Sequence, residues 1–154
     1  MKKTFAAIII LLFLQSCGYA PLHSKNQKMD FYIQSIDFDD GDKELSNFIK
    51  INLNNYFNKN TGKSFIINTT VNYQKTILSK NTEGNSEEYN LTSAISFQVN
   101  FENINKIINI TETSQMNNFS DEFKEREIEL TIKKNMARSI VSKLLLQLTR
   151  FDAS

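Results

Sequence analysis

The sequence predicts an α+β domain in which two helices pack on one face of a four-stranded, mostly antiparallel sheet, in the order β-α-β-β-β-α. Two kinds of pattern predict it. Residues 65–77 and 89–102 alternate apolar and polar side chains, as a strand with one buried face does. Residues 43–59 and 120–150 place apolar side chains three and four positions apart, which is the spacing of an amphipathic helix. Because every element has one apolar face, helices laid on one side of the sheet would bury them all.

The first two elements have clear boundaries in the sequence. A strand is expected at 31–38, which is rich in aromatic and β-branched residues. The acidic run Asp39–Asp42 suits a turn followed by a helix N-terminus. A helix is then expected over about 43–59, and Gly62 provides its stop.

Three strands are expected next. The long strand 65–77 is followed by a polar loop at 79–88 and by the strand 89–102, which has the cleanest alternation in the chain. A short turn at 103–106 leads to a further strand at about 106–113, so the last two strands are expected to form a hairpin. Their wet face is rich in Asn, Thr, Ser and Gln.

The last element is a long helix. Ser120, Asp121 and Glu122 suit its cap and its acidic first turn, and no Gly or Pro interrupts the chain from there to Arg150. Its apolar residues cover a broad arc, which predicts a wide buried face.

The first residues of the chain are typical of an export signal. Lys2 and Lys3 precede the ten-residue apolar run 5–14, and the only cysteine, Cys17, follows shortly after. Ten helical residues reach about 15 Å, which is too short for the roughly 30 Å of a bilayer's hydrocarbon core. Taken alone, this pattern leaves open a lipoprotein signal, an ordinary secretory signal, and a cysteine that is buried in the domain.

Charge and composition exclude some classes of partner and of chemistry. Without residues 1–16 the chain would keep 138 of its 154 residues, enough for one domain, and its 18 basic residues would fall to 16 against 17 acidic ones. This balance argues against a nucleic-acid-binding protein, which needs a basic field.

The sequence offers no group of catalytic or metal-binding residues. The only histidine, His23, lies in the polar segment before the domain, whereas a zinc site needs three or four convergent ligands and a catalytic triad needs a well-placed imidazole. The acidic run 37–42 lacks the spacing and the final Glu of a calcium loop, so a helix cap is the better interpretation. We therefore expect no enzyme, no cofactor and no metal.

The residues around Cys17 resemble a known processing signal. Leu14-Gln15-Ser16-Cys17 resembles the bacterial lipobox, although Gln15 stands where a small residue is usual. The resemblance implies cleavage between Ser16 and Cys17 and acylation of Cys17. Residues 1–16 would then be a signal peptide and 17–29 a lipidated N-terminus and tether. Gly18, in place of the Asp that retains enteric lipoproteins at the inner membrane, implies a lipid-anchored protein on the periplasmic side of the outer membrane.

A second resemblance concerns the whole chain. Cys17-Gly18-Tyr19-Ala20-Pro21-Leu22 resembles the opening of alphaproteobacterial lipopolysaccharide-assembly lipoproteins, the LptE family, and the runs 47–53 and 135–141 are similar to helices of that family. The segment Asp39–Lys43 departs from the family pattern. The resemblance implies one LptE-like domain over 30–154. It would act as plug and assembly partner of the LptD β-barrel in lipopolysaccharide transport.

The resemblance also implies contact with lipopolysaccharide, which is anionic at its phosphates. Lys75, Lys80 and Lys106 are the candidate contacts because each is expected at or near a strand end, although they would equally suit scattered surface lysines. The alternative function is that of another envelope lipoprotein, an accessory binding subunit of a barrel-assembly machine or of a lipid transporter.

Overall fold

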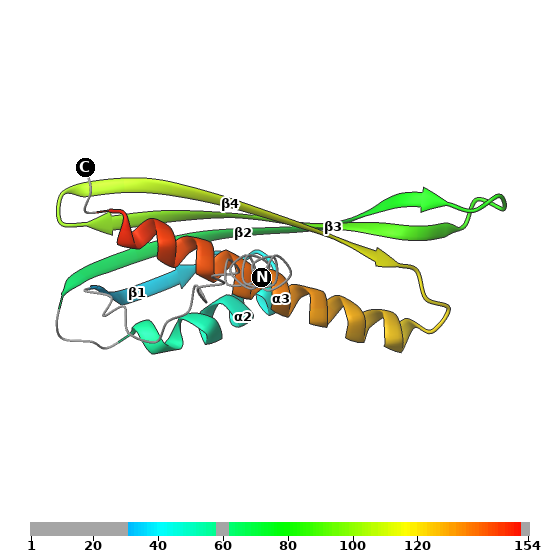
Figure 1. Cartoon of the computed structure of the whole chain (residues 1–154), viewed down its shortest axis with the longest axis horizontal. Coiled ribbons are helices and arrows are strands. Elements are labelled where there is room, and N and C mark those ends of the chain that lie inside the picture. The colour runs from blue at the N-terminus through cyan, green and yellow to red at the C-terminus, as the bar shows by residue number, and fades with distance from the viewer. Residues whose placement is uncertain (1–30, 58–61, 152–154) are drawn as a thin grey trace, which may run out of the picture.

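The computed structural model describes residues 31–57 and 62–151. Its elements follow the predicted order β-α-β-β-β-α. They are β1 (Phe31–Phe38), α2 (Lys43–Leu53), the short 3-10 helix η1 (Asn54–Tyr56), β2 (Lys63–Lys80), β3 (Ser86–Phe101), β4 (Ile104–Asn117) and α3 (Glu122–Thr149). Figure 1 shows both α-helices on the same side of the sheet, which confirms the predicted α+β architecture.

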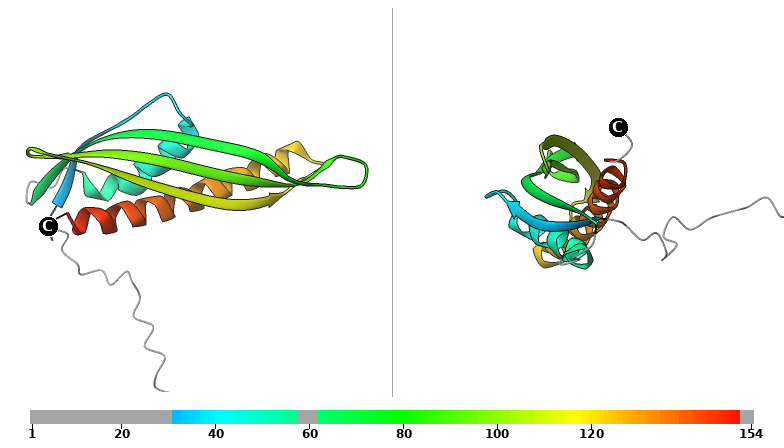
Figure 2. Two further views of the ribbon diagram at one scale, coloured as in Figure 1. Left: turned by 90° about the horizontal axis from the view of Figure 1, so that it is seen from above. Right: turned by 90° about the vertical axis from the view of Figure 1, so that its left-hand side faces the viewer.

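The sheet is mixed, with strands in the order β1-β2-β3-β4. β1 lies parallel to β2, while β2 with β3 and β3 with β4 form antiparallel hairpins. The parallel pair follows from α2, because a helical crossover returns the chain to the same end of the sheet before the next strand begins. Figure 2 shows the long sheet from above, with the helices behind it.

The first helix is shorter than the sequence predicts. Asp42 caps it by accepting the backbone N–H of Leu45 at 2.7 Å, and α2 then ends at Leu53 instead of near residue 59. The apolar spacing continues to Phe57, but Phe57 is extended and forms a parallel bridge with Ile33 of β1. Pairing with the sheet therefore overrides the helical pattern in the last turn.

The strands are longer than predicted because backbone pairing continues beyond the segments that alternate clearly in sequence. β2 runs to Lys80 and β3 begins at Ser86, so half of the expected loop at 79–88 belongs to the two strands of the hairpin. β4 likewise extends to Asn117, which pairs with Glu88. The end of β2 is exposed on both faces and gives no alternation of burial, whereas the end of β4 buries the single apolar residue Met116.

The hydrophobic core lies between the sheet and the helices. Its members come from every strand and from both α-helices, and Phe65, Phe97, Leu45 and Ile140 are fully buried among them. At the end of the molecule that carries the β3–β4 turn, the core becomes an aromatic cluster. The ring of Phe65 lies 5.4 Å from the ring of Phe101.

The long helix α3 has two different halves. Its second half, from Met136 to Leu148, buries apolar residues, whereas in its first half the buried residue is Lys133. The N-cap Asp121 accepts the backbone N–H groups of Phe123 and Lys124. Within the described part of the chain, no helix combines the length and apolar character needed to cross a membrane.

Candidate interaction surface

One face of the sheet carries no helix, and its side chains form a regular grid. It has three columns of six residues: alternate residues from Ile66 to Thr76 on β2, from Asn90 to Asn100 on β3, and from Asn105 to Gln115 on β4. The strand register aligns them in rows, such as Asn72–Ala94–Thr111. We call these eighteen residues the open face. Figure 2 shows the three strands that carry it extending along the long axis of the molecule.

The open face contains no charged residue among its eighteen described positions. Six are Asn, five Thr, three Gln and one Ser, and the other three are Ala94, Ile66 and Ile107. At the chain's overall 23% of charged residues, about four charges would be expected in eighteen positions. The wet face of a sheet is a favourable place for charges, so their absence from these positions of β2, β3 and β4 separates this surface from an ordinary solvated one. On the neighbouring strand β1, the same side of the sheet carries the carboxylate of Asp37.

Most amide side chains of the open face are available for a partner. Asn105 donates to Asn100 at 2.8 Å, and Asn90 donates to the Thr92 hydroxyl at 3.4 Å. The remaining amides make no side-chain hydrogen bond to another described residue: Asn68, Asn72, Gln74, Gln98, Asn109 and Gln115. Each amide carries both donors and acceptors, so this surface can pair with a polar partner of either kind.

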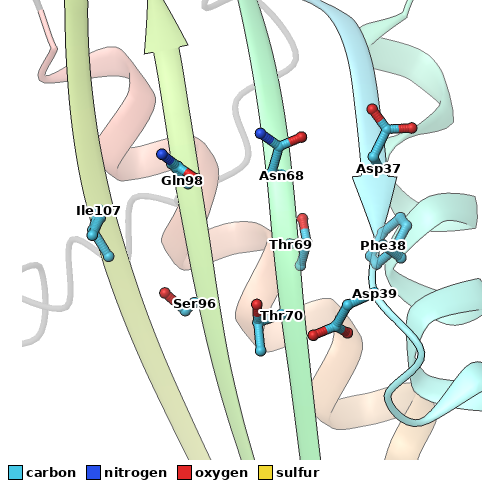
Figure 3. Close-up of a pocket in the computed structure, with 9 residues that line it drawn as sticks. All are labelled: Asp37, Phe38, Asp39, Asn68, Thr69, Thr70, Ser96, Gln98 and Ile107. Atoms are coloured by element: carbon cyan, nitrogen blue, oxygen red, sulfur yellow. The ribbon is translucent and has the colours of Figure 1, made fainter.

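A shallow hollow of about 350 Å³ lies on the open face next to β1. Figure 3 shows Asp37, Asn68 and Gln98 side by side in one row across β1, β2 and β3, with Ile107 of β4 closing the row. The carboxylate of Asp39 lies beside Thr70 in the next row. The hollow therefore offers carboxylate, amide and hydroxyl groups and one apolar edge.

The two carboxylates of the hollow differ in their hydrogen bonds. Asp39 accepts the backbone N–H groups of Gly41 and of Val71 through its Oδ1 atom, each at 3.2 Å, and so ties the turn after β1 to the edge of β2. Asp37 is exposed and makes no side-chain hydrogen bond within the described residues. Asp37 is thus the carboxylate that is available to a partner.

The charges that the open face lacks are gathered on the helix side of the sheet. The ammonium of Lys133, with a side chain only 7% exposed, donates to Asp42 at 2.7 Å and to Glu44 at 3.0 Å, and lies 4.3 Å from the centre of the Tyr73 ring. Burial alone would lower the pKa of Lys133, but the two carboxylates outweigh it and hold that pKa above its usual value.

A second set of contacts extends this network along α3. Lys75 of β2 donates to Glu125 at 2.6 Å and to Glu129 at 3.1 Å, and Tyr73 donates to Glu129 at 2.9 Å. Burial would lower the pKa of Lys75, but its two carboxylate partners raise it overall. Burial and the bond to Glu129 raise the pKa of Tyr73. These groups stay fixed in charge near neutral pH, which suits a structural clamp better than acid–base catalysis.

Solved structures with the same fold come from bacterial lipoproteins. Rare lipoprotein B from Shewanella oneidensis matches with a TM-score of 0.61 and 20% identity, over 79% of this chain and 96% of that one. A minor lipoprotein from Acinetobacter baumannii matches with a TM-score of 0.54 and 13% identity, over 77% of this chain and 94% of that one. An uncharacterized lipoprotein B from Nitrosomonas europaea matches with a TM-score of 0.53 and 15% identity, over 83% of this chain and 90% of that one.

This chain shares their fold. At these identities the likeness concerns the fold alone. No family model matches the sequence, and no curated protein matches it.

The three lysines predicted to contact lipopolysaccharide lie apart from one another. Lys75 lies on the inner face and is bound to two glutamates, as described above. Lys80 is exposed at the β2 end of the β2–β3 hairpin. Lys106 is exposed near the β3–β4 turn, at the other end of β3, with its ammonium 5.2 Å from the centre of the Phe151 ring. The structure does not bring them into one cluster.

The other predicted positions concern the start of the chain. The lipidation residue Cys17 and the cleavage position Ser16 lie outside the described residues, as does His23. Among the residues that are described, no three potential metal ligands lie close enough together to hold an ion.

Sequence reasoning missed Lys133, although a signal was present. Lys133 occupies the apolar stripe of α3, three residues before Met136 and four before Ala137. A lysine on a buried stripe needs an anionic partner, and the acidic start of the first helix at Asp42 and Glu44 was the available source.

Proposed function

We propose that this protein is a lipoprotein of the bacterial outer membrane, anchored on the periplasmic side through acyl chains on Cys17. We further propose that it acts as plug and assembly partner of an LptD-type β-barrel in the transport of lipopolysaccharide to the cell surface. Its role is to bind and position a partner, and no catalytic step is assigned to it.

The proposal rests on the agreement of two independent features. The N-terminus resembles a lipobox at Leu14–Cys17, and the domain after it has the fold of structures that are described as lipoproteins. A signal peptide does not determine the fold of the domain that follows it, so the two features are independent. Their occurrence in one chain supports a lipid-anchored envelope protein. Two or three acyl chains hold a protein firmly at a bilayer, at about 0.8 kcal/mol per buried methylene.

The open face supports the role of a plug. The lumen of a large outer-membrane barrel is polar, so a domain inside it needs a hydrogen-bonding surface more than an apolar one. Fifteen of the eighteen residues of the open face carry an amide or a hydroxyl group. The identity of the barrel comes from the resemblance of residues 17–22 to the LptE family.

Lipidation is tested by metabolic labelling with a fatty-acid analogue. We expect the full chain to be labelled and to fractionate with the outer membrane, while Cys17→Ser loses the label and accumulates in the inner membrane as uncleaved precursor. An unlabelled wild-type protein, or a labelled Cys17→Ser variant, would contradict the anchor.

The partner is tested by affinity purification of the tagged full chain from detergent-solubilised membranes. We expect a one-to-one complex with a barrel of LptD size, identified by mass spectrometry. Recovery of a barrel-assembly or lipid-transporter subunit in its place would favour the alternative role of an accessory binding subunit and would overturn the LptD partnership.

A further inference from the structure

We propose that the open face is the surface buried against the barrel, packed on the inner wall of its β-sheet, while the charged helix side remains in water. This inference rests on the proposed function, and it specifies which side of the domain meets the partner.

The charge distribution carries the inference. Interface cores are depleted of Lys, Glu and Asp because removing an unpaired charge from water costs several kcal/mol. The open face has no charge in eighteen described positions. The outer surface of the helices is charged, and Lys50, Lys134 and Arg138 are exposed there. The eighteen residues of the open face can therefore be buried without removing a charge of their own from water, and the nearest free carboxylate, Asp37 of β1, lies at the edge of the face.

The geometry of the open face fits a second sheet. Its side chains repeat with the pleat, about 6.6 Å along each strand and about 4.8 Å between strands. The inner wall of a barrel is itself a sheet, so it presents side chains on the same spacing, and two such faces pack about 10 Å apart. Unpaired amides such as Asn72 and Gln74 can then bond across the interface in both directions.

The area of the open face favours a barrel wall over a second copy of this chain. Six alternate residues span about 35–40 Å and three strands about 14 Å, which gives roughly 500 Å². Two copies joined through this face would bury about 1,000 Å², which is below the range of a standard stable interface. A barrel wall curves around the domain, so it can also contact the hollow beside Asp37 and the sheet edges.

The first test is photo-crosslinking in native membranes. A benzoylphenylalanine is placed at Asn72 or Thr111 of the open face, and as matched controls at Thr131 or Ser142, which are exposed on α3. We expect an adduct of barrel size from the open face and at least about tenfold less from α3. Adducts mainly from α3, an adduct of twice this chain's own mass, or no adduct from the open face would each overturn the inference.

The second test places charges at the interface. Asn72→Lys with Thr111→Lys changes two exposed residues, so we expect folding to be retained, and circular dichroism checks it. Recovery of the barrel by affinity purification should fall at least about tenfold, because both lysines would be buried. The control Thr131→Lys with Ser142→Lys should leave recovery unchanged.

These outcomes separate the inference from the proposed function. If the unmodified chain recovers no barrel, the proposed function fails. If it recovers the barrel, and the open-face lysines have no more effect than the α3 lysines, the proposed function stands and the assignment of the open face is wrong.

Discussion

Lys133 of α3 and Asp42, the N-cap of α2, are joined by a partly buried ion pair, with 2.7 Å between the ammonium and the carboxylate. The other oxygen of the same carboxylate accepts the backbone N–H of Leu45, also at 2.7 Å. One side chain therefore caps α2 and ties it to α3. This contact lies where the apolar core gives way to the charged first half of α3, so it adds a polar link between the two helices beside their shared hydrophobic core.

Replacing Lys133 should destabilise the domain strongly. In Lys133→Gln the carboxylates of Asp42 and Glu44 lose their common cation, and we expect a loss of about 2–4 kcal/mol in the free energy of unfolding. Urea unfolding measures it. The control is Lys134→Gln, an exposed neighbour whose ammonium lies 5.5 Å from the Phe48 ring, with an expected change within about 0.5 kcal/mol. Equal losses in the two variants would show that the buried pair has no special role.

The contact between Glu125 and Lys75 should make stability depend on pH. Its hydrogen bond to Lys75 lowers the pKa of Glu125 below its usual value. A lowered pKa in the folded state stabilises the protein above the unfolded-state pKa of about 4.3, and this contribution is lost as pH falls through the folded-state pKa. For Glu125→Gln we expect a lower free energy of unfolding at pH 7. We also expect that free energy to fall less steeply than in the wild type when urea unfolding is followed from pH 7 to pH 3.

At alkaline pH the contribution of this pair to stability is lost as pH rises, which is the opposite direction. The pKa of Lys75 is raised, so its contribution is complete below the unfolded-state pKa of about 10.4 and is lost as pH rises through the folded-state pKa. A Glu125→Gln variant whose acid limb matches that of the wild type would show that this pair does not contribute to acid stability.

The order of elements could be predicted because each has a periodic apolar face, but their ends could not. Phe57 continues the helical spacing yet is extended, since its backbone pairs with Ile33, a residue far away in sequence. The last residues of β2 are exposed on both faces, so only the partner strand specifies them, whereas the end of β4 still buries Met116, which pairs with Tyr89. At Phe57 and at the end of β2, distant backbone pairing, and not side-chain burial, decides the conformation.

Only part of the candidate site could be predicted from the sequence, for a similar reason. The polar character of the open face follows from alternation, whereas the absence of charge across it becomes evident only when the register aligns three strands in rows. The sequence predicts Lys75 at or near a strand end as a contact for lipopolysaccharide, but Lys75 continues the inward series of Val71 and Tyr73 and binds the glutamates of α3. The alternation alone would have placed Lys75 inside, and Glu125 and Glu129, four residues apart on a helix, were its natural partners.

Gly41 should tolerate a side chain less well than Gly84 does. A Cβ at Gly41 would lie 2.0 Å from the backbone oxygen of Val71, because the turn after β1 crosses the edge of β2 there. Gly84 has open space around it but a φ of +85°. We expect Gly41→Ala to cost about 2–3 kcal/mol and Gly84→Ala about 1 kcal/mol. Thermal unfolding of the two variants compares them, and a larger loss in Gly84→Ala would contradict the close approach.

The two aspartates of the hollow should respond differently to removal of the carboxylate. Asp39 holds the backbone N–H groups of Gly41 and Val71, so we expect Asp39→Ala to lose about 1–3 kcal/mol of stability. Asp37 has no side-chain hydrogen bond within the described residues, and Asp37→Ala should change stability by less than about 0.5 kcal/mol.

Urea unfolding of the purified domain separates these two roles. If Asp37→Ala is as stable as the wild type but recovers less of the barrel from membranes, its carboxylate serves the partner and not the fold. If Asp39→Ala is equally stable, the turn after β1 is held by the backbone bond from Asp39 to Thr69 at 3.0 Å, and not by the side chain. Because both residues line the same hollow, the pair tests stability and binding at one place on the open side of the sheet.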